Sequence, residues 1–253
     1  MHDFSFKRGK LYCENVSVAS LAKKHGSPLY VYSHATLTRN FGQLDTALSP
    51  VDHTIHFAVK ANSNLGVLRT LANAGSGFDI VSGGELKRVI AAGANPSKCV
   101  FAGIGKTEEE IELALKKGIY SFNAESEPEL VRINKIAGRL KKKAPIAVRV
   151  NPNIDAKTHA KITTGTYDNK FGIAFEEVEG VYERATKLKN LHLRGVQMHI
   201  GSQLTSVSPF LDALDRVLEL IDALAQKNIN IRHLDMGGGL GVTYDQEQPP
   251  QPS

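Results

Sequence analysis

The chain is poor in cysteine and contains no long apolar run. Its two cysteines, Cys13 and Cys99, lie far apart and show neither a CxxC nor a Cys/His spacing, which argues against a disulfide framework and a zinc site. No run approaches the roughly 18 apolar residues of a membrane-spanning helix, and residues 1–7 lack the apolar stretch of a secretory signal. We therefore expect a cytoplasmic protein with plain thiols, no bound metal and no membrane partner.

The chain also lacks a marked excess of one charge. It has 31 basic and 26 acidic residues, a net charge of +5, and the two signs are interspersed. The one basic run, Lys141-Lys142-Lys143, follows a helical segment, where a solvent-exposed helix face is the simpler explanation. We do not expect a nucleic acid partner.

Several common catalytic motifs are absent. There is no GxSxG turn and no HExxH zinc motif. A dinucleotide fingerprint starting at Gly237 would need glycine where Val242 stands. Gly103–Thr107 resembles the end of a P-loop, but that motif would need glycine in place of Val100. Serine-hydrolase, zinc-hydrolase and nucleotide-binding chemistry are therefore not indicated.

Short apolar runs alternate with helical patterns from about residue 54 onward, which is typical of strand and helix units that build a parallel sheet. Seven such runs occur, at residues 55–59, 77–81, 99–102, 120–123, 145–150, 195–200 and 233–236. This number of units favours an α/β fold of the TIM type, a (β/α)8 barrel, over a doubly wound sheet, because eight units typically need about 250 residues.

The eighth unit of such a barrel is missing. The chain ends in the proline-rich segment Gln248–Ser253, which gives no sign of a final strand. An incomplete barrel would expose a strand edge, so we expect the sequence to be truncated at its C-terminus. Residues 1–33 do not follow the barrel rhythm, although Leu29–Tyr32 has the pattern of a strand. We predict that residues 1–33 belong to a mostly missing second β domain and that residues 34–253 form the incomplete barrel.

Several helices are marked by their ends or by one apolar face. Thr107 with Glu110, and Ser126 with Glu129, have the spacing of capping boxes at helix N-termini. We expect Ser33 to cap the helix that follows it. One face of a long helix is marked by apolar residues at helical spacing, namely Phe210, Leu211, Leu214, Val217, Leu218, Ile221 and Leu224.

Chemistry is expected at the carboxyl ends of the strands, because barrels of this type carry their active sites there. Polar residues stand at most of these ends. They are Lys60, Asp79, Ser82, Asn123, Glu125, Arg149, Asn151, His199, Ser202 and Asp235, together with the glycines Gly237, Gly238 and Gly239. We expect a lysine, a histidine, an arginine, several acids and a glycine-rich turn to meet at one mouth of the barrel.

Lys60 ends an apolar run and is followed by small and polar residues. The simpler interpretation is a lysine at the point where the chain reaches the surface. The alternative is an amine at the rim of a pocket, where a deprotonated lysine can attack a carbonyl and form a Schiff base. The strand pattern alone leaves both interpretations open.

The run Met236–Gly241 contains three consecutive glycines, more than a tight turn requires. Backbone N–H groups without side chains can approach an anion closely, and phosphate sites after the seventh strand are common in TIM barrels. We favour a phosphate cradle over a simple turn. His199 alone would more often be a core residue, but Ser202 lies three residues on, where its hydroxyl could join the glycines around a phosphate.

Residues 151–172 show no helical or strand periodicity. Loops longer than about 15 residues in compact domains are often lids or binding loops. A surface insertion is the alternative, and the sequence does not decide between them.

Seven segments together resemble one enzyme family, the diaminopimelate decarboxylases. The segments are FAVKANSN, GFDIVSGGEL, FNAESEPEL, RVNPNIDAKTH, TTGTYDNKFGI, MHIGSQ and LDMGGGLG. The resemblance runs from about residue 12 to the end, and the ordered set is specific although no single segment is. The family belongs to fold type III of the enzymes that use pyridoxal 5′-phosphate (PLP), in which an alanine-racemase-like barrel is joined to a β domain built from both chain ends.

The resemblance implies roles for individual residues. Lys60 matches the lysine that binds PLP covalently, and His199 matches the histidine that stacks on the PLP ring; these two are the implied catalytic residues. The phosphate would be held by Ser202, Gly238 and Gly239. Polar positions that line the pocket are matched by Asp79, Glu85 and Arg149.

The implied reaction is removal of the D-centre carboxylate of meso-2,6-diaminopimelate, which gives L-lysine and carbon dioxide in the last step of lysine biosynthesis. Two departures stand out: the family's T-H-P-Y is replaced by Thr158-His159-Ala160-Lys161, and the E-P-G-R and C-E-[ST]-x-D segments are absent. Since those segments complete a site shared across a homodimer, we expect a homodimer when full length and an inactive fragment here. The alternatives are another fold type III decarboxylase, acting on ornithine, arginine or carboxynorspermidine, or a non-catalytic PLP-binding protein.

Overall fold

A parallel β-sheet organises most of the chain. The computed structural model describes residues 2–154 and 171–252. Within these residues, seven strands are hydrogen-bonded in the order β11-β10-β8-β7-β6-β5-β4, and a short strand, β9, pairs with β8. Their bounds are β4 (His56–Ala58), β5 (Gly77–Ile80), β6 (Cys99–Phe101), β7 (Ser121–Ala124), β8 (Ala144–Asn151), β9 (Ile173–Ala174), β10 (Leu191–Met198) and β11 (His233–Asp235).

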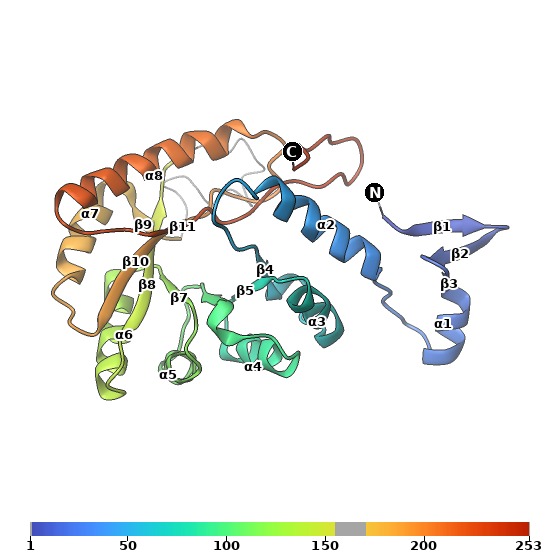
Figure 1. The fold of residues 1–253 in the computed structure, drawn as a ribbon, viewed down its shortest axis with the longest axis horizontal. Coiled ribbons are helices and arrows are strands. Elements are labelled where there is room, and N and C mark those ends of the chain that lie inside the picture. The colour runs from blue at the N-terminus through green and yellow to red at the C-terminus, as the bar shows by residue number, and fades with distance from the viewer. Residues whose placement is uncertain (1, 155–170, 253) are drawn as a thin grey trace.

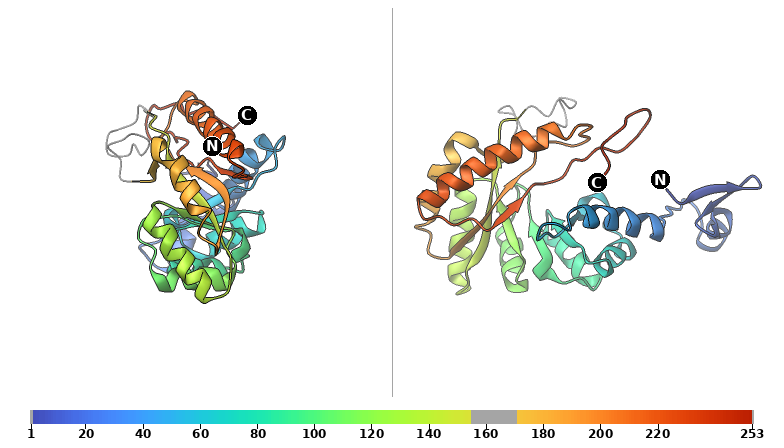
Figure 2. Two further views of the ribbon diagram at one scale, coloured as in Figure 1. Left: turned by 90° about the vertical axis from the view of Figure 1, so that its left-hand side faces the viewer. Right: turned by 45° about the horizontal axis from the view of Figure 1, so that its top comes forward.

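The strands form a half-barrel with helices on its outer face (Figure 1; Figure 2). The helices that alternate with the strands are α3 (Leu65–Asn73), α4 (Gly83–Ala91), α5 (Glu108–Lys117), α6 (Glu127–Arg139), α7 (Phe175–Ala185) and α8 (Ser208–Gln226). Two 3-10 turns, η1 (Val59–Ala61) and η2 (Pro96–Lys98), lie beside β4 and β6. All seven predicted strands and the incomplete (β/α)8 architecture are therefore confirmed, and β9 is an addition that the sequence pattern did not indicate.

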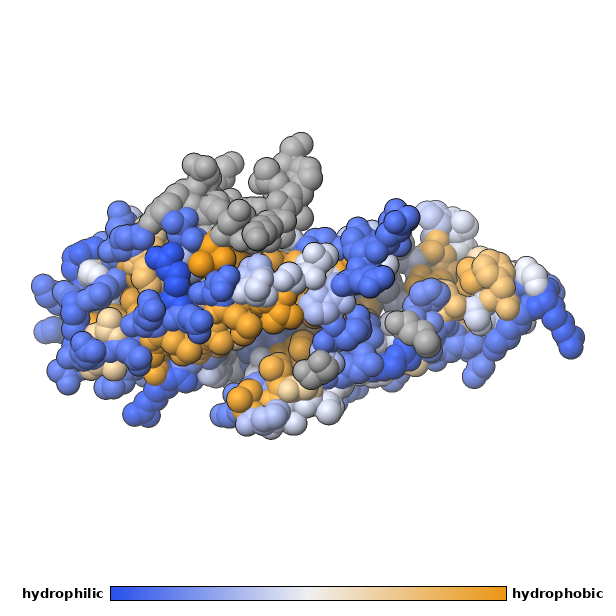
Figure 3. All heavy atoms as spheres, turned by 90° about the horizontal axis from the view of Figure 1, so that it is seen from above, coloured by the Kyte–Doolittle hydropathy of each residue, from blue (hydrophilic) through white to orange (hydrophobic). Residues whose placement is uncertain are grey.

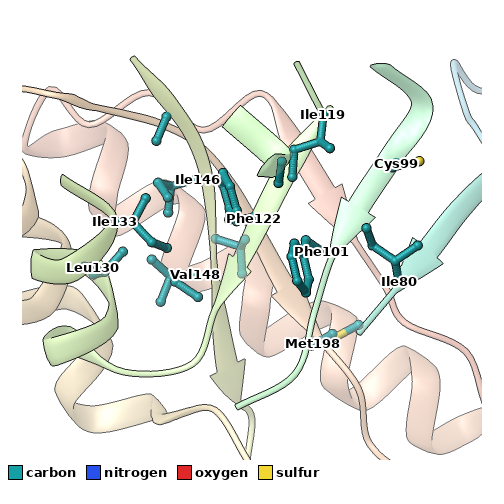
Figure 4. Close-up of a cluster of buried hydrophobic side chains, with 14 of the residues drawn as sticks. Ile80, Cys99, Phe101, Ile119, Phe122, Leu130, Ile133, Ile146, Val148 and Met198 are labelled. Carbon is teal, nitrogen blue, oxygen red and sulfur yellow. The ribbon is translucent and has the colours of Figure 1, made fainter. Parts of the chain in front are cut away.

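The hydrophobic core lies between the outer face of the sheet and the helices (Figure 4). Alternate residues of β8, Ile146 and Val148, are fully buried there, and so are Leu130 and Ile133 of α6. The strand period of two and the helix spacing of three to four thus direct the apolar side chains of both elements into one layer. The intervening residues of the strands face the inside of the half-barrel.

The predicted helix ends agree with the structure at α2 (His34–Ala47) and α5. Ser33 Oγ accepts a hydrogen bond from Thr36 N at 3.0 Å. Thr107 and Glu110 form a complete capping box, with Glu110 N to Thr107 Oγ1 at 3.2 Å and Thr107 N to Glu110 Oε2 at 3.0 Å. These local bonds satisfy N–H groups that a helix cannot satisfy by itself.

The N-terminal segment forms a separate small sheet at one end of the molecule (Figure 1). Its antiparallel strands are β1 (Phe4–Lys7), β2 (Lys10–Cys13) and β3 (Val16–Ser17), followed by α1 (Val18–His25). The strand expected at Leu29–Tyr32 is wrong: among the described residues no strand pairs with this segment, and Tyr30 is 84% exposed. Without a hydrogen-bonding neighbour, an apolar run does not become a strand. That residues 1–33 belong to a second domain stays a prediction.

The long helix α8 buries a face slightly different from the predicted one. Its buried residues include Val217 and Leu224, as expected, but Leu211 and Leu218 are 54% and 44% exposed. Ala213 and Leu220 take the inward positions instead, so the buried stripe is rotated around the helix. Figure 3, which views the molecule from above, on the side where α8 lies in Figure 1, shows a band of apolar residues on the outer surface.

The structure bears on three further expectations, namely the lid, the absence of a membrane-spanning helix and the state of the cysteines. Most of the predicted lid, residues 155–170, including Thr158-His159-Ala160-Lys161, lies outside them. In the part of the chain that is described, no helix is long and apolar enough to cross a membrane. Cys13 and Cys99 are both free and buried, as the spacing predicted.

The tight packing of β4 against β5 predicts the effect of a small substitution. A Cβ on Gly77 would lie 2.5 Å from His56 Cδ2 and 2.6 Å from the backbone oxygen of Lys98. We expect Gly77→Ala to lower the free energy of unfolding by about 1 to 3 kcal/mol, because the crowding includes backbone that cannot rotate away. Urea unfolding followed by circular dichroism measures the change.

Gly42→Ala is the matched control. Gly42 lies inside α2 with nothing within 4 Å of an added Cβ, so alanine should raise the free energy of unfolding by about 0.5 to 1 kcal/mol. Equal effects of the two substitutions would contradict the packing argument.

Candidate functional site

The carboxyl ends of the parallel strands bring the predicted polar residues to one edge of the sheet. Lys60 lies in the 3-10 turn η1, directly after β4, and its side chain is exposed. Its positive charge acts on both Asp79, at the end of β5, and His199, just beyond β10. Three residues that are far apart in sequence therefore share one electrostatic environment.

The surroundings of Asp79 disfavour the ionised form of its carboxyl group. Burial raises its pKa to about 7, and the carboxylates of Asp235 and Glu85 add to this, while Lys60 and Arg149 oppose it. Within the described residues, its Oδ1 is buried and has no hydrogen-bond partner. This group therefore titrates near neutral pH and has an atom ready to contact a ligand.

His199 is held in its neutral form. Its pKa is lowered to about 4, chiefly by burial and also by the positive charges of Arg149 and Lys60, against the opposing effect of Asp235. Its Nδ1 accepts a long hydrogen bond, 3.4 Å, from Gly238 N. The imidazole is consequently a flat, uncharged ring at neutral pH, with its tautomer assigned from this contact.

The glycine turn after β11 packs against the loop after β10. A Cβ on Gly239, which has a φ of +110°, would lie 1.9 Å from the backbone oxygen of Gly201, and Leu204 N donates to Gly239 O at 2.8 Å. By contrast, a Cβ on Gly238 would meet nothing within 4 Å. Ser202 follows Gly201 and is exposed, so the hydroxyl and the open glycine lie on adjoining loops.

Arg149, on β8, is buried and paired. Its Nη1 lies 3.1 Å from Glu125 Oε1, and its guanidinium carbon lies 5.0 Å from the centre of the Phe171 ring. Glu125 also accepts a hydrogen bond from Gly103 N at 3.0 Å. These contacts fix the guanidinium from several directions, which restricts where its charge can act.

Asp235, which the sequence placed only at a strand end, connects two parts of the site. Its Oδ2 accepts from Asn123 Nδ2 at 2.9 Å, and its Oδ1 accepts from Gly237 N at 2.8 Å. The carboxylate thereby ties β7 to the start of the glycine turn. Asn123 Oδ1 is buried without a partner among the described residues.

The sequence interpretation missed a buried ion pair, Lys106 with Glu129. Lys106 Nζ lies 2.7 Å from Glu129 Oε1, and the two side chains are 0% and 3% exposed. In the sequence, Lys106 lies within the incomplete P-loop pattern Gly103–Thr107, and Glu129 has the spacing of a capping residue.

Comparison with known proteins identifies the family. The model of the pyridoxal binding domain of pyridoxal-dependent decarboxylases matches residues 34–253. The chain belongs to this family. Among curated proteins it is similar to the diaminopimelate decarboxylase of Vibrio cholerae, 59% identical over 97% of this chain and 59% of that protein, and to that of Pseudomonas aeruginosa, 53% identical over 99% of this chain and 60% of that protein.

Solved structures show the same likeness. Diaminopimelate decarboxylase from M. jannaschii in co-complex with L-lysine is 36% identical, with a TM-score of 0.91 over 100% of this chain and 61% of that chain. The enzyme from Helicobacter pylori complexed with L-lysine is 40% identical, with a TM-score of 0.89 over 92% of this chain and 59% of that chain. The chain spans about three fifths of the length of the curated relatives it matches.

The pyridoxal-binding domain described here fits its cofactor, PLP. The open face of Gly238, where an added Cβ would meet nothing within 4 Å, leaves room for a phosphate, and glycine-rich turns of this kind suit anions. The neutral ring of His199 suits a flat aromatic partner, and the unpartnered Oδ1 of Asp79 suits a polar group on that partner. The amine of Lys60 at the rim has the chemistry to react with an aldehyde.

The raised pKa of Asp79 predicts a pH-dependent stability of the PLP-free chain. The folded chain binds this proton more tightly than the unfolded chain, so the contribution of Asp79 is present in acid and is lost as the pH rises from about 4 to about 7. We expect Asp79→Asn to gain stability relative to the wild type between pH 5 and pH 8, by at most about 3 kcal/mol.

Urea unfolding at both pH values gives the comparison. Asp212→Asn, which removes an exposed carboxylate on α8, is the control and should show no such gain. If the difference in the free energy of unfolding between wild type and Asp79→Asn does not change with pH, burial does not raise the pKa of Asp79.

Proposed function

We propose that the protein containing this chain is a diaminopimelate decarboxylase, which removes carbon dioxide from meso-2,6-diaminopimelate and forms L-lysine. The observation that carries the proposal is the convergence of Lys60, Asp79, Arg149 and His199 on the edge where the glycine turn lies. The names of the relatives from V. cholerae and P. aeruginosa support the substrate. So does the L-lysine in the complexes from M. jannaschii and H. pylori.

In this proposal each residue of the candidate site has a distinct role. Lys60 would attach the cofactor covalently, while Ser202, Gly238 and Gly239 would hold its phosphate. When bound, PLP supplies an electron sink for the electrons released as a carboxylate leaves. The chain would bind and orient PLP, which is what the protein contributes in enzymes whose cofactor carries the chemistry.

The charged residues would set the protonation states around the cofactor. His199 stays neutral chiefly because it is buried, and the nearby charges of Arg149 and Lys60 add to this effect, so its ring can stack without adding a further positive charge. Asp79, with a pKa raised to about 7, can either donate or accept a hydrogen bond near neutral pH. We further propose a homodimer and a cytoplasmic location for the complete gene product, as the family resemblance implies.

Covalent attachment of PLP at Lys60 is the first test. Incubation with PLP, reduction with borohydride and peptide mapping should place the pyridoxyl group on Lys60, because its amine lies among the residues that fit the cofactor. The complete gene product should then release carbon dioxide from meso-2,6-diaminopimelate, and Lys60→Ala should abolish both the label and the release.

Lys98→Ala is the control, since Lys98 Nζ binds Gly75 O at the opposite end of the strands, and it should leave both unchanged. A label on another lysine would refute the role of Lys60. Release from ornithine or arginine in place of diaminopimelate would refute the substrate but keep the cofactor.

The open face of Gly238 gives a second test. A methyl group there meets no protein atom, so Gly238→Ala should leave the free energy of unfolding within about 0.5 kcal/mol of the wild type. It should nevertheless weaken PLP binding, measured by equilibrium titration, because the methyl would occupy the space of the phosphate.

Gly239→Ala makes the contrast. Its methyl would collide with Gly201 O, so this substitution should lower stability as well as PLP binding. Undiminished PLP affinity in a folded Gly238→Ala variant would place the phosphate elsewhere.

A further inference from the structure

A continuous buried network runs from helices α5 and α6 to the candidate site. Lys106, in the loop before α5, donates from Nζ to Gly103 O at 2.6 Å, to Asn123 O at 2.9 Å and to Glu129 Oε1 at 2.7 Å. An ammonium has three donors, so all of them are engaged within the described residues. The ammonium thereby joins the turn after β6, the strand β7 and the first turn of α6.

Glu129 carries the network toward the site. Its Oε2 accepts from Glu125 N at 2.9 Å. The Glu125 side chain in turn accepts from Gly103 N at 3.0 Å and from Arg149 Nη1 at 3.1 Å. Gly103 is therefore held through its oxygen by Lys106 and through its nitrogen by Glu125, which closes a ring of hydrogen bonds. Arg149 is attached to this ring through Glu125.

Stability does not explain why a lysine and a glutamate are buried here. Removing two charges from water costs several kcal/mol for each ion, and replacing a buried pair with apolar residues is often neutral or stabilising. The pair's hydrogen bonds, however, lead to Arg149 through Glu125 and to Asp235 through Asn123. The pair is connected to residues that face the site by contacts that apolar side chains could not make.

We propose that the buried Lys106–Glu129 pair is a positioning device, which holds Glu125 and through it the guanidinium of Arg149 at the edge where the reaction takes place. The inference rests on the proposed decarboxylase function for its kinetic consequence. Lys106 and Glu129 bind Gly103 O, Asn123 O and Glu125 N, and the route from these contacts to Arg149 runs through Glu125.

The test replaces the pair with apolar side chains of similar length, as the double variant Lys106→Met with Glu129→Met. In the complete gene product, the double variant should still fold and unfold cooperatively, because loss of the buried charges offsets part of the cost of leaving Gly103 O, Asn123 O and Glu125 N without their partners. Its kcat/KM for meso-2,6-diaminopimelate should nevertheless fall by about 10- to 100-fold, the range expected when a reacting group is misplaced by about 1 Å.

A histidine titration distinguishes positioning from a general loosening of the fold. Burial has the largest effect on the pKa of His199, and Arg149, Lys60, Asp235 and Gly238 N–H also act on it. If Arg149 leaves its position, the pKa of His199 should rise toward 6.5 in the double variant, as followed by NMR of labelled histidine in the PLP-free chain. His56 and His233, whose pKa values are lowered by burial at the other end of the strands, should not change.

Glu127→Gln is the matched control. Glu127 lies two residues before Glu129 on α6 and forms an exposed ion pair with Arg184, Oε1 to Nε at 2.8 Å. Its loss removes a carboxylate from the same helix turn without touching Glu125, so kcat/KM and the pKa of His199 should remain those of the wild type.

The outcomes separate the two proposals. A wild-type protein that does not release carbon dioxide refutes the proposed function, and the His199 titration still tests the positioning role. An active, folded double variant with unchanged kcat/KM and unchanged His199 titration overturns the positioning role alone. A double variant that fails to fold overturns it as well, because the pair would then serve stability.

Discussion

The parallel alignment of the strands is the constraint on which the site depends. Because neighbouring strands from β4 to β11 run in the same direction, every strand delivers the residue after its last hydrogen bond to the same edge. Lys60 and Gly239 thus lie at the same edge of the sheet although most of the chain separates them. Close approach at Gly77 and Gly195, where any Cβ would collide with a neighbouring strand's histidine, lets large polar side chains fill the inside of the half-barrel.

Buried charged groups need partners, and the site residues differ in how far they have them. Arg149 is balanced by Glu125, and Lys106 by Glu129. Asp235 is satisfied by Asn123 and by a backbone N–H. Asp79 lacks such a balance: its carboxyl is buried near other acids, its pKa is raised to about 7, and one of its oxygens is unpartnered in the described part of the chain, as are Asn123 Oδ1 and Glu125 Oε2. Uncompensated groups of this kind are typical of positions that a ligand completes.

The sequence predicted the elements with strong local signals and failed where a distant partner decides. The seven strands follow from short apolar runs, and the site follows from the polar residues after them. Ser126 and Glu129 show the limit: Ser126 Oγ accepts from Glu129 N at 3.4 Å, as a capping box requires, but the Glu129 carboxylate turns to Lys106 and to Glu125 N. A spacing of three residues cannot reveal an ammonium that arrives from 23 positions away. The predicted strand at Leu29–Tyr32 failed for the converse reason, since none of the strands in residues 2–154 and 171–252 pairs with it.

The opposite end of the half-barrel shows why the chemistry belongs at the carboxyl ends. There Tyr120 packs edge-on against His233, with ring centres 5.0 Å apart, and the Arg194 guanidinium lies 4.1 Å from the centre of the Tyr120 ring. Burial lowers the pKa of both His56 and His233, so their neutral forms are favoured and their contribution to stability is lost as the pH falls below about 6.5. Aromatic rings and a stacked cation fill this end, whereas the other end places titratable groups around an open glycine. The same half-barrel therefore places aromatic packing at one end of the strands and the charged and glycine-rich residues of the candidate site at the other.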